Sequence, residues 1–196
     1  MTQGIALIVG LGNPGPEYAE TRHNAGFRFL EAVLAHAGGS LRDEARFLGR
    51  VGRINIAGCE VWLLAPSTFM NHSGQAVTKL ARYYRISTPQ ILVVHDEIDL
   101  PLGTLRLKLG GGDGGHNGVH DVAEQLGSSD FVRLRIGVGR PGPGLDGTAY
   151  VLRRAPEAEQ KLIDDSIESG RLYLEDMVTG QYQRVMNALH APTETD

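Results

Sequence analysis

A short apolar run that ends in a turn rich in glycine and proline constrains this chain most. Leu7, Ile8 and Val9 have the composition of a buried strand, and Gly-Leu-Gly-Asn-Pro-Gly over residues 10–15 ends that strand sharply. Apolar residues then recur at helical spacing over residues 24–37. The order strand, turn, helix is typical of α/β proteins, whose ligands bind at the carboxyl ends of parallel strands.

The same turn contains the G-x-G-x-x-G spacing of dinucleotide-binding proteins. In those proteins the last glycine opens the helix, whereas here Pro16, Glu17 and Tyr18 follow and the helical pattern begins several residues later. The match therefore favours a simple reversal of the chain, in which glycine supplies a positive φ, over a dinucleotide site.

The whole pattern predicts an α/β fold: a single domain over residues 1–190, with a twisted, mixed, largely parallel central sheet flanked by helices. Neither a linker nor a repeat interrupts the 196 residues, which suffice for one sizeable core. The polar residues 191–196 are expected to form a disordered tail. Strands are expected at residues 45–56, 60–65, 91–94, 105–109 and 131–138, and helices at residues 74–84, 119–126 and from 156 to a stop at 180.

Composition and charge bear on the class of protein. No apolar run reaches the length of a membrane span and the N-terminus lacks a signal-peptide pattern, so no membrane partner and a cytoplasmic location are expected. The single cysteine, Cys59, excludes an internal disulfide and is expected to be buried beside a hairpin turn at residues 57–58. The formal net charge of −4 does not by itself indicate a nucleic-acid partner, so basic residues have to be judged locally.

Polar residues gather on the loops at the ends of the predicted strands. Asn13 and His23 follow the first strand, Asn71 precedes a helix, and Asp96 follows the strand at residues 91–94. Parallel strands would bring these loops to one edge of the sheet. A histidine with one ring nitrogen held by a carboxylate is a general base of fixed tautomer, which predicts His23 with Asp96 as that pair. A local hydrogen bond or a helix cap would explain either residue equally well.

Other kinds of chemistry have weaker support. The chain has no G-x-S-x-G motif and nothing marks Cys59 as activated, so water is the expected nucleophile. His95, Glu97, His116 and His120 are potential metal ligands. No H-E-x-x-H or comparable spacing joins them, so no metal and no other cofactor is expected.

Three asparagines, Asn13, Asn71 and Asn117, suit a mechanism that uses water. An amide NH₂ group can donate to a developing oxyanion, and the amide oxygen can hold a water or an N–H group. Asparagine is also common in turns, so turn geometry alone could account for its presence at each of these positions. The sequence leaves open which of them would donate to the oxyanion.

Five ordered motifs together resemble bacterial peptidyl-tRNA hydrolases, and the similarity covers nearly the whole chain up to about His190. The motifs are residues 10–15 with Tyr18, 21–26, 66–74, 95–101 and 114–118. The resemblance implies an esterase that cleaves the bond between a peptide and the terminal ribose of tRNA. Such cleavage frees the tRNA of peptidyl-tRNA that was released prematurely.

The resemblance also implies roles for individual residues. His23 corresponds to the general base acting on water, Asp96 to the group that stabilises its basic form, and Asn13 to the position that distinguishes blocked from free aminoacyl-tRNA. Lys108 and Arg135 correspond to a basic pair that clamps the 5′ phosphate of tRNA. Residues expected to contact the substrate or to lie close to it are Tyr18, Phe69, Met70, Asn71, His116 and Asn117. Packing in the hydrophobic core would equally account for an apolar side chain at Phe69 and at Met70.

Asp113 departs from the resemblance, because family members often carry histidine at this place in the glycine-rich loop. Its negative charge would weaken the approach of a phosphate or simply face solvent. The family also implies a monomer with no obligate protein partner. Competing interpretations are a non-catalytic RNA- or peptide-binding module, which would need Lys108 and Arg135 but no His–Asp pair, and a nucleotide-binding enzyme that uses the first turn. Neither explains the five motifs together.

Overall fold

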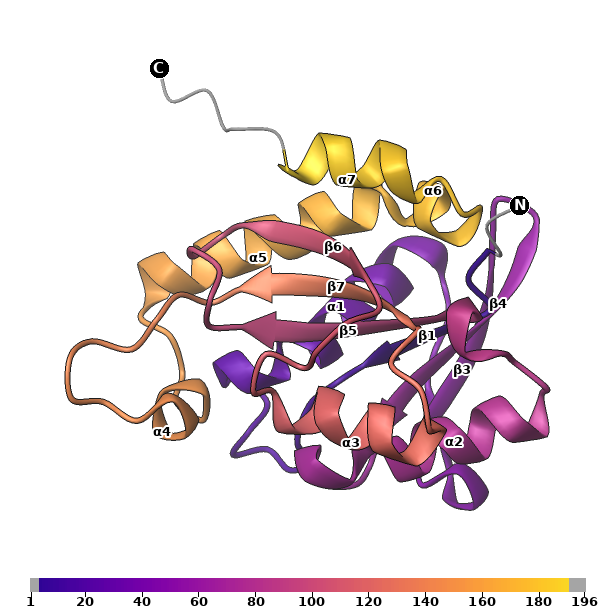
Figure 1. The fold of residues 1–196 in the computed structure, drawn as a ribbon, viewed down its shortest axis with the longest axis horizontal. Helices are drawn as coiled ribbons and strands as arrows, with labels where there is room; N and C mark the ends of the chain where they lie inside the picture. The colour runs from indigo at the N-terminus through magenta and orange to yellow at the C-terminus, as the bar shows by residue number, and fades with distance from the viewer. Residues whose placement is uncertain (1–3, 191–196) are drawn as a thin grey trace.

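The computed structural model describes residues 4–190, so the predicted tail at residues 191–196 lies outside the described residues. A seven-stranded sheet forms its centre (Figure 1). The strand order is β2 (Arg42–Glu44), β3 (Gly49–Ile56), β4 (Cys59–Pro66), β1 (Leu7–Gly10), β5 (Ile91–Glu97), β7 (Val132–Gly137) and β6 (Leu105–Leu109). Strand β1 pairs in parallel with β4 and β5, and β5 with β7, whereas β2–β3, β3–β4 and β6–β7 are antiparallel pairs. The predicted mixed α/β sheet is confirmed.

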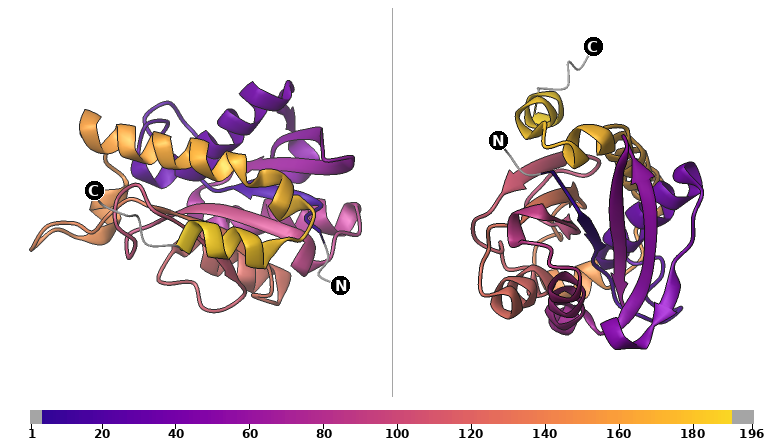
Figure 2. Two further views of the ribbon diagram at one scale, coloured as in Figure 1. Left: turned by 90° about the horizontal axis from the view of Figure 1, so that it is seen from above. Right: turned by 90° about the vertical axis from the view of Figure 1, so that its right-hand side faces the viewer.

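Helices cover both faces of the sheet (Figures 1 and 2). Helices α1 (Ala25–Ala37), α5 (Glu157–Leu172) and α6 (Leu174–Val178) pack on one face, and α2 (Ser73–Tyr83) and α3 (Asn117–Leu126) pack on the other. Helix α7 (Tyr182–His190) lies along the edge strand β6, where the N–H of Leu107 donates to His190 Nε2. None of the helices in the described part of the chain is long and apolar enough to cross a membrane.

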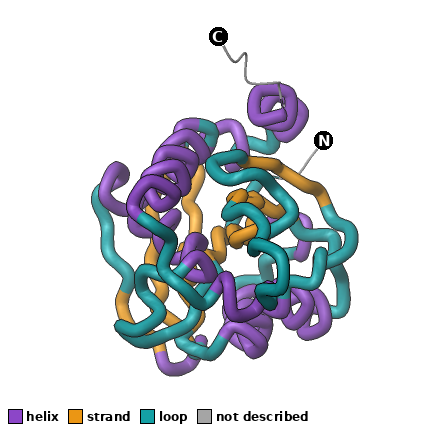
Figure 3. The backbone as a smooth tube through the Cα atoms, turned by 90° about the vertical axis from the view of Figure 1, so that its left-hand side faces the viewer, coloured by secondary structure: helices purple, strands orange, loops and turns teal. Residues whose placement is uncertain are grey.

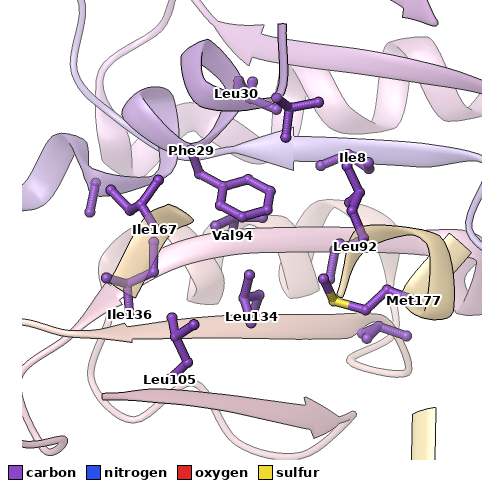
Figure 4. Packing of buried hydrophobic residues seen from close by; sticks show 14 of the residues in the cluster. Ile8, Phe29, Leu30, Leu92, Val94, Leu105, Leu134, Ile136, Ile167 and Met177 are labelled. Atoms are coloured by element: carbon purple, nitrogen blue, oxygen red, sulfur yellow. The ribbon is translucent and has the colours of Figure 1, made fainter. Parts of the chain in front are cut away.

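The central strands are apolar on both sides because both faces of the sheet are covered. Ile8, Leu92 and Leu134 point to the α1 and α5 face, where Phe29 packs against them (Figure 4). Their neighbours along the strands, such as Leu7 and Val93, belong to the cluster under α2 and α3. The continuous apolar runs in the sequence thus correspond to strands buried between two helical layers.

The structure corrects several details of the sequence prediction. Residues 45–47 form the 3-10 turn η2 (Ala45–Phe47) rather than the start of a strand. Cys59 is exposed rather than buried, because residues 57–60 at the tip of the β3–β4 hairpin all face solvent. The single C-terminal helix expected up to Gly180 is divided between α5 and α6.

The carboxyl ends of β1, β5 and β7 lie at one edge of the sheet, which is on the left in Figure 1. Figure 3 looks onto this edge and shows it occupied largely by loops. A short helix, α4 (Gly147–Val151), lies beyond the strand ends on the same side (Figure 1). The polar residues singled out in the sequence are carried by the loops at this edge.

Candidate active site

His23 is placed by close packing between the first helix and the sheet. It lies in η1 (Arg22–Asn24), a 3-10 turn that leads directly into α1. A Cβ atom on Gly26 would lie 2.3 Å from the carbonyl oxygen of Val94 and 2.4 Å from the nitrogen of Leu11. Glycine therefore permits the approach that brings η1 to the end of β5.

The glycines of the turn at residues 10–15 have two different functions. Gly15 has a φ of 109°, as a turn glycine should. Gly10 does not have a positive φ, but its Cβ would lie 2.3 Å from the carbonyl oxygen of Gly26. Helix α1 begins only at Ala25, so the turn does not have the strand–glycine–helix geometry of a dinucleotide site.

Asp96, near the end of β5, joins two histidines. Its side chain is 2% exposed, and His23 Nδ1 lies 2.9 Å from its Oδ1 and 3.1 Å from its Oδ2. His116 Nε2 also lies 2.9 Å from Oδ1. His116 precedes α3, so the site combines the loops that follow β1 and β6 with the end of β5. The predicted juxtaposition of His23 and Asp96 is confirmed, and the contact with His116 is additional.

The hydrogen bonds assign the protons on both imidazoles. The backbone N–H of Val119 donates to His116 Nδ1 at 3.3 Å, so His116 carries its proton on Nε2 and donates it to Asp96. His23 donates to Asp96 through Nδ1–H, which leaves its Nε2 unprotonated in the neutral ring. The geometry therefore gives His23 the form of a general base.

The charges at the site change the pKa values of Asp96 and His23 in opposite directions. Burial alone would raise the pKa of Asp96, but His23 and His116 outweigh it and lower that pKa well below the usual range for aspartate. Burial lowers the pKa of His23, while the charge and hydrogen bond of Asp96 raise it, and the net result is a pKa above 6.5. The carboxylate thus stays ionised and holds a strengthened base.

One group of side chains among the described residues has metal-binding geometry, namely His23, Asp96 and His116, whose nearest ligand atoms lie within 4.8 Å of one another. A neutral histidine that binds a metal through one nitrogen carries its proton on the other. His116 Nδ1 instead accepts the N–H of Val119, so its Nε2 holds a proton where a metal would need a lone pair. The arrangement suits proton transfer better than metal binding.

The other potential metal ligands, His95 and His120, are engaged in different contacts. His95 is fully buried, and its Nδ1 donates to the backbone carbonyl of Asp96 at 2.7 Å. Burial lowers the pKa of His95 well below 6.5, so its ring is neutral. His120 is largely exposed on α3 and pairs with Asp113 at 2.8 Å.

Asn13 is buried and held from two sides. Its Oδ1 accepts the N–H of Met70 at 2.7 Å. Asn24 fixes its backbone, because Asn24 Oδ1 accepts the N–H of Asn13 and Asn24 Nδ2 donates to the carbonyl of Asn13. The Nδ2 group of Asn13 makes no hydrogen bond to any residue of the 4–190 range, so it remains available as a donor. Asn24 was not among the predicted site residues, although it belongs to the same sequence motif as His23.

An exposed aromatic edge lies beside this loop. Phe69 is 56% exposed, and its ring meets that of Tyr18 edge to face at 6.4 Å. Asn71, in the turn η3 (Met70–His72), is also exposed. Met70 is buried in the core under α2 and α3, which matches its alternative explanation as a packing residue.

A pocket of about 230 Å³ opens at His23 and Asp96. His116, Asn117 and the glycines before them form one side of it. A further part of its wall consists of Gly147, Thr148 and Val151 from α4 and of Asp146, which precedes that helix. This wall was missed in the sequence, where the only sign of it is Asp146 as the N-cap of a short helix.

The predicted phosphate-binding residues lie on adjacent strands. Lys108 on β6 makes no hydrogen bond within the part of the chain that the structure describes, and its pKa is lowered first by partial burial and then by Arg133 and Arg135. Arg135 is paired with Glu97 at 3.0 Å. Arg133 is 1% exposed and donates to the carbonyls of residues 110 and 112, so it holds the glycine-rich loop.

Comparison with known proteins identifies the family. The model of the peptidyl-tRNA hydrolase family matches residues 7–196. The chain is 48% identical to the peptidyl-tRNA hydrolase of Tolumonas auensis, over 97% of this chain and 98% of that one. The chain belongs to the peptidyl-tRNA hydrolase family. It is also 50% identical to the peptidyl-tRNA hydrolase of Methylococcus capsulatus, over 95% of this chain and 99% of that one.

A solved peptidyl-tRNA hydrolase has the same fold. The crystal structure of the enzyme from Acinetobacter baumannii matches with a TM-score of 0.93 and 46% identity, over 97% of each chain. The resemblance stated from the motifs and the fold class are therefore confirmed. The roles of individual residues within a peptidyl-tRNA hydrolase reaction stay predictions.

Proposed function

We propose that His23 and Asp96 catalyse the hydrolysis of peptidyl-tRNA, with water as the nucleophile and without a metal ion. As a member of its family, the protein hydrolyses the ester bond of peptidyl-tRNA. The observation that carries the proposed mechanism is the contact of one carboxylate with two histidines, because it leaves His23 Nε2 free beside the pocket.

The reaction proceeds in two steps. His23 Nε2 takes a proton from water as the water oxygen attacks the ester carbonyl, and Asp96 stabilises the imidazolium that forms. The tetrahedral intermediate then collapses, the bond between the carbonyl carbon and the ribose oxygen breaks, and the His23 proton passes to that oxygen. The products are free tRNA and a peptide with a C-terminal carboxylic acid, which releases its proton to solvent, and the neutral base is regenerated.

Asn13 provides the basis for selecting N-blocked substrates. Because its Oδ1 already accepts the N–H of Met70 while its Nδ2 has no partner in the described chain, the side chain presents mainly N–H donors to a substrate. A donor can bind the carbonyl oxygen of the last peptide bond, whereas the α-ammonium group of a free aminoacyl-tRNA has no lone pair to accept it. The side chain thus favours an acylated amine.

The remaining predicted contacts surround this reaction. The exposed ring of Phe69 and the neighbouring Tyr18 offer an aromatic surface to the substrate, and Asn71 and Asn117 offer amide groups. Asn117 lines the His23 pocket and Asn13 does not, which makes Asn117 the better candidate to donate to the oxyanion.

The tRNA is bound through its acceptor end, with its 5′ phosphate at Lys108 and Arg135. Lys108 is the stronger partner, since Arg135 already pairs with Glu97. The substrate is a product of translation, so the protein acts in the cytoplasm.

The first experiment measures the release of free tRNA from N-acetyl-aminoacyl-tRNA and from unblocked aminoacyl-tRNA, with a metal chelator present. We expect rapid cleavage of the blocked ester only. His23→Ala should lower kcat by about 10²–10⁴-fold and leave tRNA binding intact. His36→Ala is the matched control, because His36 is an exposed histidine at the end of α1.

Each other outcome rejects part of the proposal. Full turnover by His23→Ala would exclude His23 as the base. Loss of the wild-type activity in chelator would show that a metal takes part. Binding of tRNA without cleavage by the wild type would favour the non-catalytic RNA-binding module.

A further inference from the structure

Arg22, the residue before His23, is buried and binds the segment that follows α4. Its side chain is only 5% exposed. Its Nη1 atom lies 3.3 Å from each of three backbone carbonyl oxygens, those of Tyr150, Arg153 and Arg154. Its Nη2 atom pairs with Glu159 at 2.9 Å. The guanidinium also lies over the ring of Tyr150, 4.0 Å from its centroid.

The backbone makes the same connection. The N–H of Arg22 donates to the carbonyl of Arg153 at 3.2 Å, and Thr21 forms an isolated antiparallel bridge with Arg154. Tyr150 is further tied to the end of β7, because its hydroxyl donates to the carbonyl of Val138 at 2.8 Å. The turn that carries His23 and the end of α4 therefore form one unit.

Helix α4 depends on these contacts. It has only five residues, too few for a helix that is stable by itself. Residues 142–146 before it are exposed, and the helix lies beyond the strand ends, away from the two helical layers (Figure 1). Arg22 thus supplies much of what fixes α4, and α4 lines the same pocket as His23.

We propose that Arg22 is a positioning residue that sets the width of the active-site pocket by holding α4 to the His23 turn. This inference rests on the proposed function of that pocket. Within the described chain the Arg22 side chain contacts the segment around α4 and Glu159 and not the cluster of His23, Asp96 and His116, so it acts on the bound end of the tRNA only through the α4 wall. Its loss therefore weakens substrate binding and leaves the chemical step unchanged.

Lysine cannot replace arginine in this role. A guanidinium presents donors in a planar fork and stacks on an aromatic ring, whereas an ammonium is a compact point charge. Arg22→Lys keeps the positive charge near Glu159 but loses the contact with the three carbonyls and the stacking on Tyr150. The variant thus separates charge from geometry.

The experiment compares kcat, KM and the pH profile of Arg22→Lys with those of the wild type on N-acetyl-aminoacyl-tRNA. We expect KM to rise about tenfold and kcat to stay within about twofold. The acid limb of kcat/KM should not move, because the His23–Asp96 contact is untouched. Arg53→Lys is the matched control, since Arg53 also has an ion pair and an aromatic partner but lies on the exposed hairpin.

Tyr150→Leu removes the aromatic partner of Arg22 and should also raise KM. This second variant tests the inference if Arg22→Lys does not fold. A fall in kcat with unchanged KM, a shifted acid limb, or no change in either variant would overturn the inference. Failure of the wild type to cleave the blocked ester would instead reject the proposed function.

Discussion

At the scale of single residues, Asp96 decides where the protons of the site are. One of its oxygens accepts from both His23 and His116, so neither ring can turn without losing a charge-assisted hydrogen bond. The two histidines keep the pKa of Asp96 below its usual range despite burial, and the ionised carboxylate in turn raises the pKa of His23. A base held in this way is stronger but becomes protonated at a higher pH.

The pH dependence of Asp96→Asn follows from these charges. The base acts in its neutral form, so wild-type kcat/KM should fall as the pH drops through the pKa of His23, which lies above 6.5. Removal of the carboxylate lowers that pKa, so the acid limb of the variant should move to lower pH while the maximal rate falls by about 10²-fold or more. A pH profile of kcat/KM measures both effects. An acid limb at the wild-type position would mean that His23 is not the titrating group.

At the scale of elements, the position of η1 depends on the contact of Gly26 with the sheet. Gly26→Ala would place a methyl group 2.3 Å from the carbonyl oxygen of Val94, against backbone that cannot move aside cheaply. We expect a loss of about 3 kcal/mol in the free energy of unfolding, measured by urea denaturation. Gly142→Ala is the control and should change stability by less than about 0.5 kcal/mol, because nothing lies within 4 Å of its Cβ position. Equal effects of the two substitutions would show that the packing of η1 does not require glycine.

Elements with strong apolar periodicity could be predicted from the sequence, and elements held by distant contacts could not. Residues 91–94 are apolar without interruption because β5 is buried on both faces, so this strand and Asp96 at its end were found. Helix α4 has five residues, and its anchor Arg22 is 128 positions away from Tyr150. No local sequence pattern indicates a contact between segments that lie so far apart in the chain. His23 and Asp96 are 73 positions apart as well, but each comes after a strongly apolar strand, and the carboxyl ends of those parallel strands meet at one edge of the sheet, so this pair was predicted while the α4 wall was missed.

At the scale of the whole molecule, the protein carries a net negative charge although its substrate, tRNA, is a polyanion. The formal net charge is −4, so attraction to tRNA must come from a local group of cations. Lys108, Arg133 and Arg135 lie together on β6 and β7, and Glu97 forms an ion pair with Arg135. The negative charge of Asp113 is partly compensated, because its carboxylate binds His120 and accepts the N–H of Gly115, and it therefore repels phosphate less.

Lys108→Ala should therefore weaken tRNA binding mainly through the loss of one phosphate contact. Each contact of this kind contributes about 0.7 to 0.9 to the slope of log affinity against log salt concentration, so the variant should show a shallower slope by that amount. Binding of tRNA measured over a series of salt concentrations gives the slope. Lys79→Ala, which removes an exposed lysine on α2, serves as the matched control and should leave the slope unchanged. If Lys108→Ala kept the wild-type slope, Lys108 would not contact phosphate, and the affinity for tRNA would have to come from another surface.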